Sequence, residues 1–227
     1  MANNIAIDGP AGAGKSTIAK IVAKKMGYIY VDTGAMYRAM ALYLLRKDVD
    51  KNDQNAIELA CEDADISIAY ENDEQVVLLN GENVNGLIRS EEVGNMASVS
   101  STNAKVRQKL VSLQQKLAKQ KNVVMDGRDI GTVVLPDAAC KIYLTASSKV
   151  RAVRRYNELI AKGESCDIDV IEADIIDRDN RDMSRSISPL KQAEDAILVD
   201  SSDMTVEEVA IKILEIAETK VNGSNCC

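Results

Sequence analysis

The stretch I-A-I-D-G-P-A-G-A-G-K-S-T, residues 5–17, begins as an apolar run, breaks into glycines and resumes as a helical pattern. The apolar run predicts a short buried strand, and the glycines lack the Cβ atoms that would keep a backbone from wrapping tightly around an anion. Residues 9–16 match the pattern G-x-x-x-x-G-K-S of a phosphate-binding loop. A glycine-rich turn that merely links a strand to a helix is the alternative, but the Lys-Ser pair and both flanking elements favour phosphate binding.

The spacing within this loop has a physical reason. Successive backbone N–H groups must converge on phosphate oxygens, while the helix that follows directs its positive end at the same charge. Lys15 is expected to reach the β- and γ-phosphates of a nucleotide, and the Ser16 hydroxyl to ligate the Mg²⁺ carried in with it. The loop residues expected to bind the nucleotide are Gly9, Pro10, Ala11, Gly12, Ala13, Gly14, Lys15, Ser16 and Thr17.

Length and composition limit the remaining possibilities. With 227 residues, 46% of them hydrophobic, the chain can bury one sizeable core and a small appended subdomain. No apolar run is long enough to cross a bilayer, and the first strand starts too near the N-terminus to leave room for a signal peptide, so we expect a cytoplasmic protein without membrane contact. The odd number of cysteines, without a C-x-x-C pair, predicts reduced thiols, with Cys226 and Cys227 in an exposed tail.

Several kinds of chemistry are excluded by residues that the sequence lacks. Without histidine, neither a Ser-His-Asp site nor a His-ligated metal can form. The net charge of −7 and the absence of Trp and Phe argue against nucleic-acid binding. Phosphoryl transfer fits these limits, because it depends on positioning and charge stabilisation rather than on a base that titrates near neutrality.

Strands and helices alternate at the start of the chain. A helix is predicted over residues 16–26, a strand over 28–31, and then a helix whose inner face carries Met36, Met40, Leu44 and Leu45. Further buried strands are expected at 123–125, 142–144 and 197–199. Close succession of strand and helix predicts parallel βαβ units, so we expect a five-stranded parallel sheet whose strands end in polar or glycine residues at the ligand-binding edge.

The alternation lapses at about residues 60–95. Two short apolar runs, at 66–70 and 76–79, and the Asn80-Gly81 pair predict antiparallel strands with a tight turn. The remaining helices are expected at about 52–64, 102–120, 148–161 and 168–184, and after Thr205, which forms a capping box with Glu208. The apolar stripe of the helix at 102–120 consists of Val106, Leu110, Leu113 and Leu117.

Arginines recur where phosphate chemistry would use them. Arg178, Arg181 and Arg185 stand at i, i+3 and i+7, so they share one helix face if the segment stays helical, with Asp182 beside them. Such a row can clamp a phosphoryl group in transfer. It can equally be a solvated face paired with neighbouring aspartates, and the spacing alone does not decide between the two.

Two further clusters are open to the same pair of interpretations. Arg151, Arg154 and Arg155 begin a helix after a strand, where one or two of them contact a donor nucleotide or all lie at the surface. Asp126 follows an apolar strand and is placed like the carboxylate that helps to hold Mg²⁺ beside a phosphate loop, although a turn or cap aspartate would look alike. We favour a site role for Asp126.

Four motifs in order resemble the bacterial cytidylate kinases of the nucleoside monophosphate kinase family. They are I-D-G-P-A-G-A-G-K-S-T at 7–17, D-T-G-A-M-Y-R at 32–38, D-G-R-D-I-G-T-V-V at 126–134 and R-D-N-R-D-M-S-R at 178–185. The resemblance runs from end to end of the chain. The first motif occurs in many nucleotide-binding proteins, whereas the other three are specific to this family.

The resemblance implies an α/β protein with the P-loop nucleoside monophosphate kinase fold. It implies core residues at about 1–59, 96–150 and 186–227, an acceptor-binding insertion at about 60–95 and an Arg-rich lid at about 151–185. It also implies direct in-line transfer of a phosphoryl group from ATP, with Mg²⁺, to CMP or dCMP. Small nucleotides would then be the partners of a protein that acts as a monomer.

The resemblance also assigns residues of this chain to roles. Thr33, Tyr37 and Arg38 would line the acceptor pocket, with Arg38 on the monophosphate. Three residues would read the cytosine edge, namely Ser98, Arg107 and Asp129. Arg128 would hold phosphate, and Arg178 and Asp182 would contact the sugar. The residues expected to stabilise the transferred group are Lys15, Arg128, Arg181 and Arg185, and Arg155 is expected at the donor.

Two rival functions are kept beside this one. A kinase for another small acceptor, such as UMP or a non-nucleotide alcohol, would carry the same phosphate loop. A nucleotide-dependent switch or binding module would also carry it, but no N-K-x-D guanine-reading motif occurs in the chain, and a lid rich in arginine suits transfer better than signalling.

Overall fold

A computed structural model of the chain describes residues 3–71 and 74–224, which form two compact units. One unit comprises the described residues up to Tyr30 and from Lys121 onward, and the other comprises Val31–Gln120. The expected division into core, insertion and lid follows different boundaries and remains a prediction. Cys226 and Cys227 lie outside the described residues, while Cys61, Cys140 and Cys166 are free thiols.

A five-stranded parallel sheet confirms the predicted architecture. Its strand order is β2-β6-β1-β7-β8, with a crossover at each non-consecutive neighbour. In the register of β1, Asp8 lies beside Gly127 on one side and Tyr143 on the other. The strands are β1 (Ile5–Asp8), β2 (Ile29–Asp32), β6 (Val123–Gly127), β7 (Cys140–Thr145) and β8 (Ile197–Asp200).

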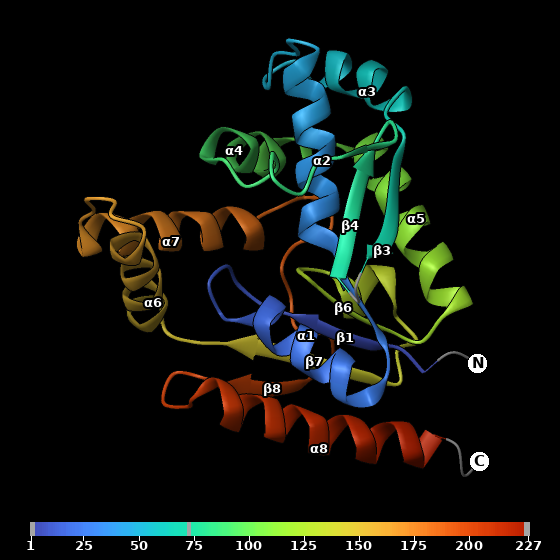
Figure 1. The fold of residues 1–227 in the computed structure, drawn as a ribbon, viewed down its shortest axis with the longest axis vertical. Coiled ribbons are helices and arrows are strands. Elements are labelled where there is room, and N and C mark those ends of the chain that lie inside the picture. Colours follow the sequence, from blue (N-terminus) through green and yellow to red (C-terminus); the bar gives the residue numbers. More distant parts are fainter. Residues whose placement is uncertain (1–2, 72–73, 225–227) are drawn as a thin grey trace. The chain divides into compact units, whose positions relative to one another are not determined.

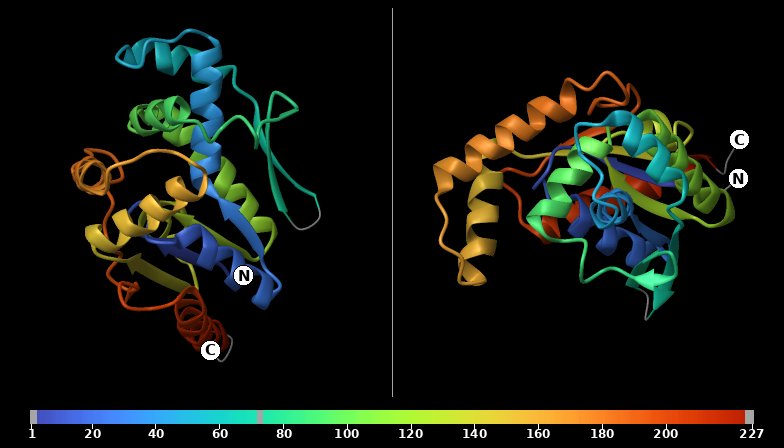
Figure 2. Two further views of the ribbon diagram at one scale, coloured as in Figure 1. Left: turned by 60° about the vertical axis from the view of Figure 1, so that its left-hand side comes forward. Right: turned by 90° about the horizontal axis from the view of Figure 1, so that it is seen from above.

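The core of the first unit packs α1 and α8 against the sheet, as Figure 1 shows. Ile7, Val22, Ile142 and Ile213 are among the fully or almost fully buried side chains that meet there. Two further helices, α6 and α7, pack against each other (Figure 2). The helices of this unit are α1 (Lys15–Met26), the short π-helix η1 (Ile130–Val134), α6 (Ser148–Ala161), α7 (Ile168–Met183) and α8 (Val206–Ser224).

The second unit combines a small antiparallel sheet with helices. Asn80 and Gly81 both have positive φ angles, 50° and 81°, and they turn β4 into β5 as the Asn-Gly pair predicts. Figure 1 shows β3 and β4 running beside α2, which contacts β4. The elements are α2 (Thr33–Arg46), α3 (Gln54–Glu62), β3 (Ile66–Glu71), β4 (Glu74–Leu79), β5 (Glu82–Asn83), α4 (Glu91–Ser100) and α5 (Ala104–Gln120).

One helix of the second unit is missing from the prediction, and another buries a different face. α4 begins at Ser90, whose hydroxyl accepts a hydrogen bond from the Val93 N–H at 3.3 Å. Its glycine and serines lower the helix propensity and hide a buried i, i+3, i+4, i+7 row. In α5, Leu113 and Leu117 are only partly buried, because the buried row continues through Gln114 and Ala118.

Within the described residues, no helix is long and apolar enough to cross a membrane.

The capping box before α8 gives a stability prediction. Thr205 Oγ1 accepts a hydrogen bond from the Glu208 N–H at 3.2 Å, and the Thr205 N–H donates to Glu208 Oε2 at 2.8 Å. Thr205→Ala should therefore lower the free energy of unfolding by about 1 kcal/mol in urea titrations. Thr219 in the same helix donates only to the Glu215 carbonyl, so Thr219→Ala is the matched control and should change stability little. Equal losses in the two variants would contradict the capping role.

Candidate functional site

The loop between β1 and α1 leaves a helix start uncapped. Gly14, the residue before α1, has φ 87° and provides no side-chain cap for the first turn. The first N–H groups of a helix have no partner within the helix, so this end is suited to an anion. Gly9 brings the loop so close to β7 that a Cβ atom there would lie 1.9 Å from the Leu144 carbonyl oxygen.

Lys15 lies folded back inside this loop. The residue is only 6% exposed, and Nζ donates a hydrogen bond to the Pro10 carbonyl at 2.7 Å. Burial, and secondly the positive charge of Arg128, lowers the pKa of Lys15 to about 7. The amine is thus held at the loop by one backbone acceptor, which a phosphate oxygen can replace.

Ser16 and Asp126 meet next to the loop. Ser16 Oγ donates to Asp126 Oδ2 at 2.9 Å, and the Tyr30 hydroxyl donates to Asp126 Oδ1 at the same distance. A hydroxyl and a carboxylate are the hard oxygen ligands that Mg²⁺ prefers, and the ion usually adds waters and nucleotide phosphates to so few protein ligands. The pair therefore fits Mg²⁺ that arrives with a nucleotide.

Asp8, the last residue of β1, supports the segment after β6. Its Oδ1 accepts a hydrogen bond from the Ile130 N–H at 2.8 Å, and its Oδ2 accepts one from the Gly131 N–H at 2.7 Å. Burial raises the pKa of Asp8 to about 6, although both N–H groups favour the charged form. Asp8 thereby fixes the start of η1, next to Arg128 and Asp129. No role is predicted for Asp8 from the sequence, although a carboxylate at the end of an apolar strand was the available signal.

Asp182 accepts hydrogen bonds from two of the predicted arginines. Asp182 is 1% exposed, and its Oδ2 accepts a hydrogen bond from Arg128 Nε at 2.8 Å. Its Oδ1 accepts from Arg185 Nη2. Burial by itself would raise the pKa of Asp182, but the charges of Arg128 and Arg185 outweigh it, so the pKa lies below its usual value. These three predicted residues are together in the first unit.

The predicted row of arginines on one helix face is only partly correct. α7 ends at Met183, so Arg185 lies beyond the helix, although Asp182 still brings it close to Arg128. Arg178 and Arg181 are exposed on α7, and Arg181 Nε donates to the Asp177 carbonyl at 3.3 Å.

The three arginines of α6 have different surroundings. Arg151 is buried and donates to the Ala11 carbonyl of the phosphate loop at 3.0 Å, while its Nη2 lies 2.7 Å from Asp179 Oδ2 of α7. Arg154 donates to the Ser201 carbonyl at 2.7 Å. Arg155 is exposed and pairs with Glu158 at 3.1 Å. The support that Arg151 gives the loop spans 140 positions in the chain, so no local pattern could have revealed it.

The second unit holds the remaining predicted residues. Thr33 is buried at the start of α2, and further along this helix Arg38 Nη2 lies 3.3 Å from Asp32 Oδ2. The guanidinium of Arg107, a buried residue of α5, lies 5.6 Å from the centre of the Tyr37 ring. The fifth predicted residue, Ser98, is partly buried in α4, and its carbonyl accepts a hydrogen bond from Ser101.

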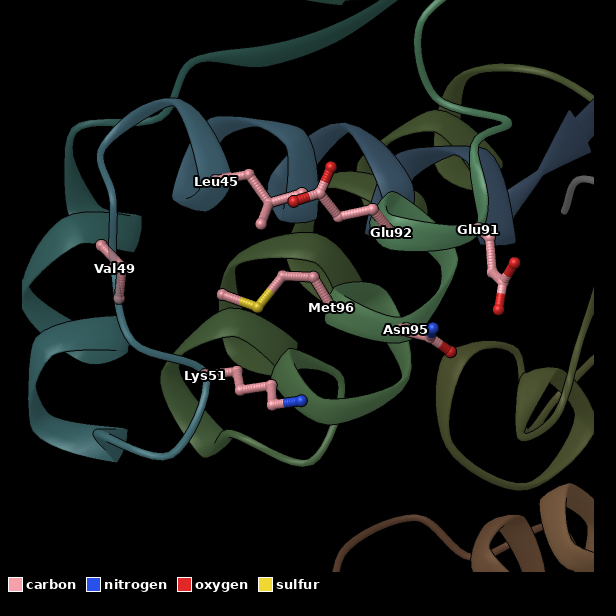
Figure 3. Close-up of a pocket in the computed structure, with 7 residues that line it drawn as sticks. All are labelled: Leu45, Val49, Lys51, Glu91, Glu92, Asn95 and Met96. Carbon is pink, nitrogen blue, oxygen red and sulfur yellow. The ribbon is translucent and has the colours of Figure 1, made fainter.

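A surface cavity of about 620 Å³ in the second unit contains none of the predicted residues. In the view of Figure 3, Leu45 and Glu92 lie above Met96, and Lys51 lies below it. Its lining residues are Leu45, Val49, Lys51, Glu91, Glu92, Asn95 and Met96.

Comparisons with known proteins agree with the motifs. A family model described as cytidylate kinase matches residues 5–219. The cytidylate kinase of Caldicellulosiruptor saccharolyticus is 53% identical over 94% of both chains. That of Bacillus subtilis strain 168 is 46% identical over 96% of this chain and 97% of its own.

Solved structures of low identity share the fold. A shikimate kinase from Bacteroides thetaiotaomicron is 15% identical, with a TM-score of 0.50 over 95% of this chain and 98% of its own. An uncharacterized protein from Eubacterium ventriosum is 12% identical, with a TM-score of 0.54 over 96% of this chain and 99% of its own. These likenesses concern the fold alone.

The close approach at Gly9 gives a second prediction. Gly9→Ala places a methyl group against a backbone carbonyl, so the variant should lose several kcal/mol or fail to fold. Gly14→Ala meets no atom within 4 Å and has only its positive φ to accommodate, so it should lose about 1 kcal/mol and stay folded. Thermal unfolding compares the two. A Gly9 variant as stable as the Gly14 variant would show that the loop does not need this contact.

Proposed function

This chain belongs to the cytidylate kinase family, and from that premise we propose that it transfers the γ-phosphoryl group of ATP to CMP and dCMP. The observation that carries the proposal is the open helix start at Gly14, with Lys15 inside the loop and Ser16 hydrogen-bonded to Asp126. A helix start without a side-chain cap, an amine that phosphates bring into its charged form and a pair of oxygen ligands suit a Mg²⁺-bound triphosphate.

The donor half of the reaction rests on the first unit. The loop residues 9–17 bind the phosphates of ATP, and Lys15 exchanges its bond to Pro10 for the β- and γ-phosphates. Mg²⁺, held by Ser16 with Asp126 beside it, would neutralise charge that develops between these phosphates. Arg155, exposed on α6, extends towards the rest of the nucleotide in this proposal.

The acceptor is read by hydrogen bonds of defined polarity. Cytosine presents an amino donor at C4 beside acceptors at N3 and O2, so the Asp129 carboxylate can accept while Arg107 and Ser98 donate. Uracil reverses the polarity at C4 and N3 and leaves buried groups badly paired, which discriminates strongly. Arg38, with Thr33 and Tyr37, binds the monophosphate in this proposal. Arg178 and Asp182 contact the sugar.

Transfer then requires positioning and positive charge rather than a base. The acceptor phosphate is already an anionic nucleophile, so no proton has to be removed before attack. Lys15, Arg128, Arg181 and Arg185 stabilise the oxygens of the group in transfer. Arg181 and Arg185 belong to the lid segment, whose closure would exclude the water that otherwise hydrolyses ATP. We further propose that the protein acts as a monomer in the cytoplasm on free nucleotides.

ADP release over a panel of CMP, dCMP, UMP and AMP tests the proposed function. CMP and dCMP should be the best acceptors, with UMP poor and AMP inactive. Preference for UMP or a non-nucleotide alcohol would identify a different acceptor, and ATP binding without acceptor-dependent ADP release would favour a binding module.

Lys15→Met should lower kcat by at least about a hundredfold while its thermal unfolding stays close to that of the native chain.

The lowered pKa of Lys15 predicts proton uptake when ATP binds. At pH 8 an amine with a pKa of about 7 is mostly neutral, and adjacent phosphates favour its charged form. The native chain should therefore take up about one proton per ATP, measured by calorimetry in buffers of different ionisation enthalpy. Lys15→Arg is the matched control, because its guanidinium is charged at every working pH and should show no such uptake. Equal proton uptake by the native chain and Lys15→Arg would show that a group other than Lys15 takes up the proton.

A further inference from the structure

The small antiparallel sheet of the second unit is attached to the two ends of α2 by different polar contacts. Near the start of α2, Gln75 of β4 contacts the backbone of Asp32. Near its end, Arg46 forms a two-point ion pair with Glu82 of β5, at 2.6 and 3.0 Å. Only the first contact lies close to Arg38, the residue that we propose to bind the acceptor phosphate.

Gln75 pairs with Asp32 as a neighbouring strand would. The Asp32 N–H donates to Gln75 Oε1 at 2.7 Å, and Gln75 Nε2 donates to the Asp32 carbonyl at 3.3 Å. A primary amide is the side chain that offers one acceptor and one donor in the same plane, and therefore it satisfies both backbone groups at once. Asn85 in turn donates to the Gln75 carbonyl at 2.8 Å, which holds this part of β4.

The side chain of Asp32 connects this fixed backbone to Arg38. Asp32 Oδ1 caps α2 by accepting a hydrogen bond from the Ala35 N–H at 2.8 Å, and Oδ2 accepts one from Arg38 Nη2 at 3.3 Å. Gly34 leaves room for this arrangement, since a Cβ atom there would lie 3.2 Å from both Arg38 Nη1 and Asp32 Oδ1. The Asp32 carboxylate thus orients the guanidinium of Arg38, and Gln75 holds the backbone of Asp32.

Arg38 keeps hydrogen-bonding capacity for an anion. Its contact with Asp32 is long, and within the part of the chain that the structure describes its buried Nε makes no hydrogen bond. A buried donor without an acceptor is costly, and a phosphate oxygen would relieve that cost. The position of this guanidinium should therefore affect how tightly the acceptor binds.

We propose that Gln75 is a positioning residue for the acceptor monophosphate and acts through Asp32 on Arg38. This inference rests on the proposed function, in which Arg38 binds the phosphate of CMP. It gives the antiparallel sheet a role in acceptor binding that does not require the sheet to touch the nucleotide.

The test compares the two attachments of the sheet. Gln75→Leu keeps the size of the side chain and removes both bonds to Asp32, whereas Glu82→Gln weakens the attachment at the other end. Loss of two hydrogen bonds should raise the KM for CMP about tenfold in Gln75→Leu, with the KM for ATP within about twofold of native. Glu82→Gln should leave both KM values within about twofold, and thermal unfolding is measured for each variant.

A double-mutant cycle separates positioning from a general structural effect. Arg38→Met should raise the KM for CMP by itself, and adding Gln75→Leu should then raise it little further, because the two act through one guanidinium. Additive effects, an equal rise in Glu82→Gln, or a native KM in Gln75→Leu would each overturn the inference. If Arg38→Met leaves the KM for CMP unchanged, the proposed phosphate role of Arg38 fails instead, and the inference falls with it.

Discussion

Main-chain amides can hold phosphate only where the backbone itself comes close and its N–H groups are not already engaged. The loop after β1 meets both conditions. At Gly9 the chain approaches β7 too closely for any side chain, and at Gly14 it enters α1 in a left-handed conformation that leaves the first turn uncapped. The sheet and helices of the first unit hold the backbone of the loop in this conformation.

Buried charge around the loop is balanced by specific partners rather than by solvent. Lys15, Asp8 and Asp182 are all buried, and each meets an opposite charge or a backbone group. Burial moves the pKa of Lys15 down and that of Asp8 up, whereas two guanidiniums hold the pKa of Asp182 low. Such a network suits a site that receives a polyanion, because the guanidinium groups of Arg128 and Arg185 are already held in place.

Arg38, in the second unit, has different surroundings. Its guanidinium is oriented by the carboxylate of Asp32, which also caps α2. The backbone of Asp32 is in turn held by Gln75. An arginine with one long ionic contact has donors left for a ligand, whereas a fully paired arginine such as Arg151 has a structural task. Arginines of the same protein thus differ in function because the fold engages different numbers of their hydrogen-bond donors.

Much of the architecture could be predicted from local patterns. All five strands of the parallel sheet followed from short apolar runs, which in the central strands β1 and β6 are buried on both faces. The Asn80-Gly81 turn and the Thr205 capping box followed from residue preferences that act within four positions. α4 was missed because Gly94 and its serines weaken the helical signal, and the buried face of α5 was misjudged because polar Gln114 lies inside.

The sequence by itself determined the strands, the phosphate loop and the family, because these depend on residues close together in the chain or on motifs in a fixed order. Tertiary structure alone decided which partners the buried and half-buried charged groups have. Arg151 reaches Ala11, Arg128 reaches Asp182, and Asp8 reaches Ile130, over separations of 140, 54 and 122 residues. Spacing along a helix could not settle these partners, because a side chain bonds to whatever the packing of distant segments brings within about 3 Å of it.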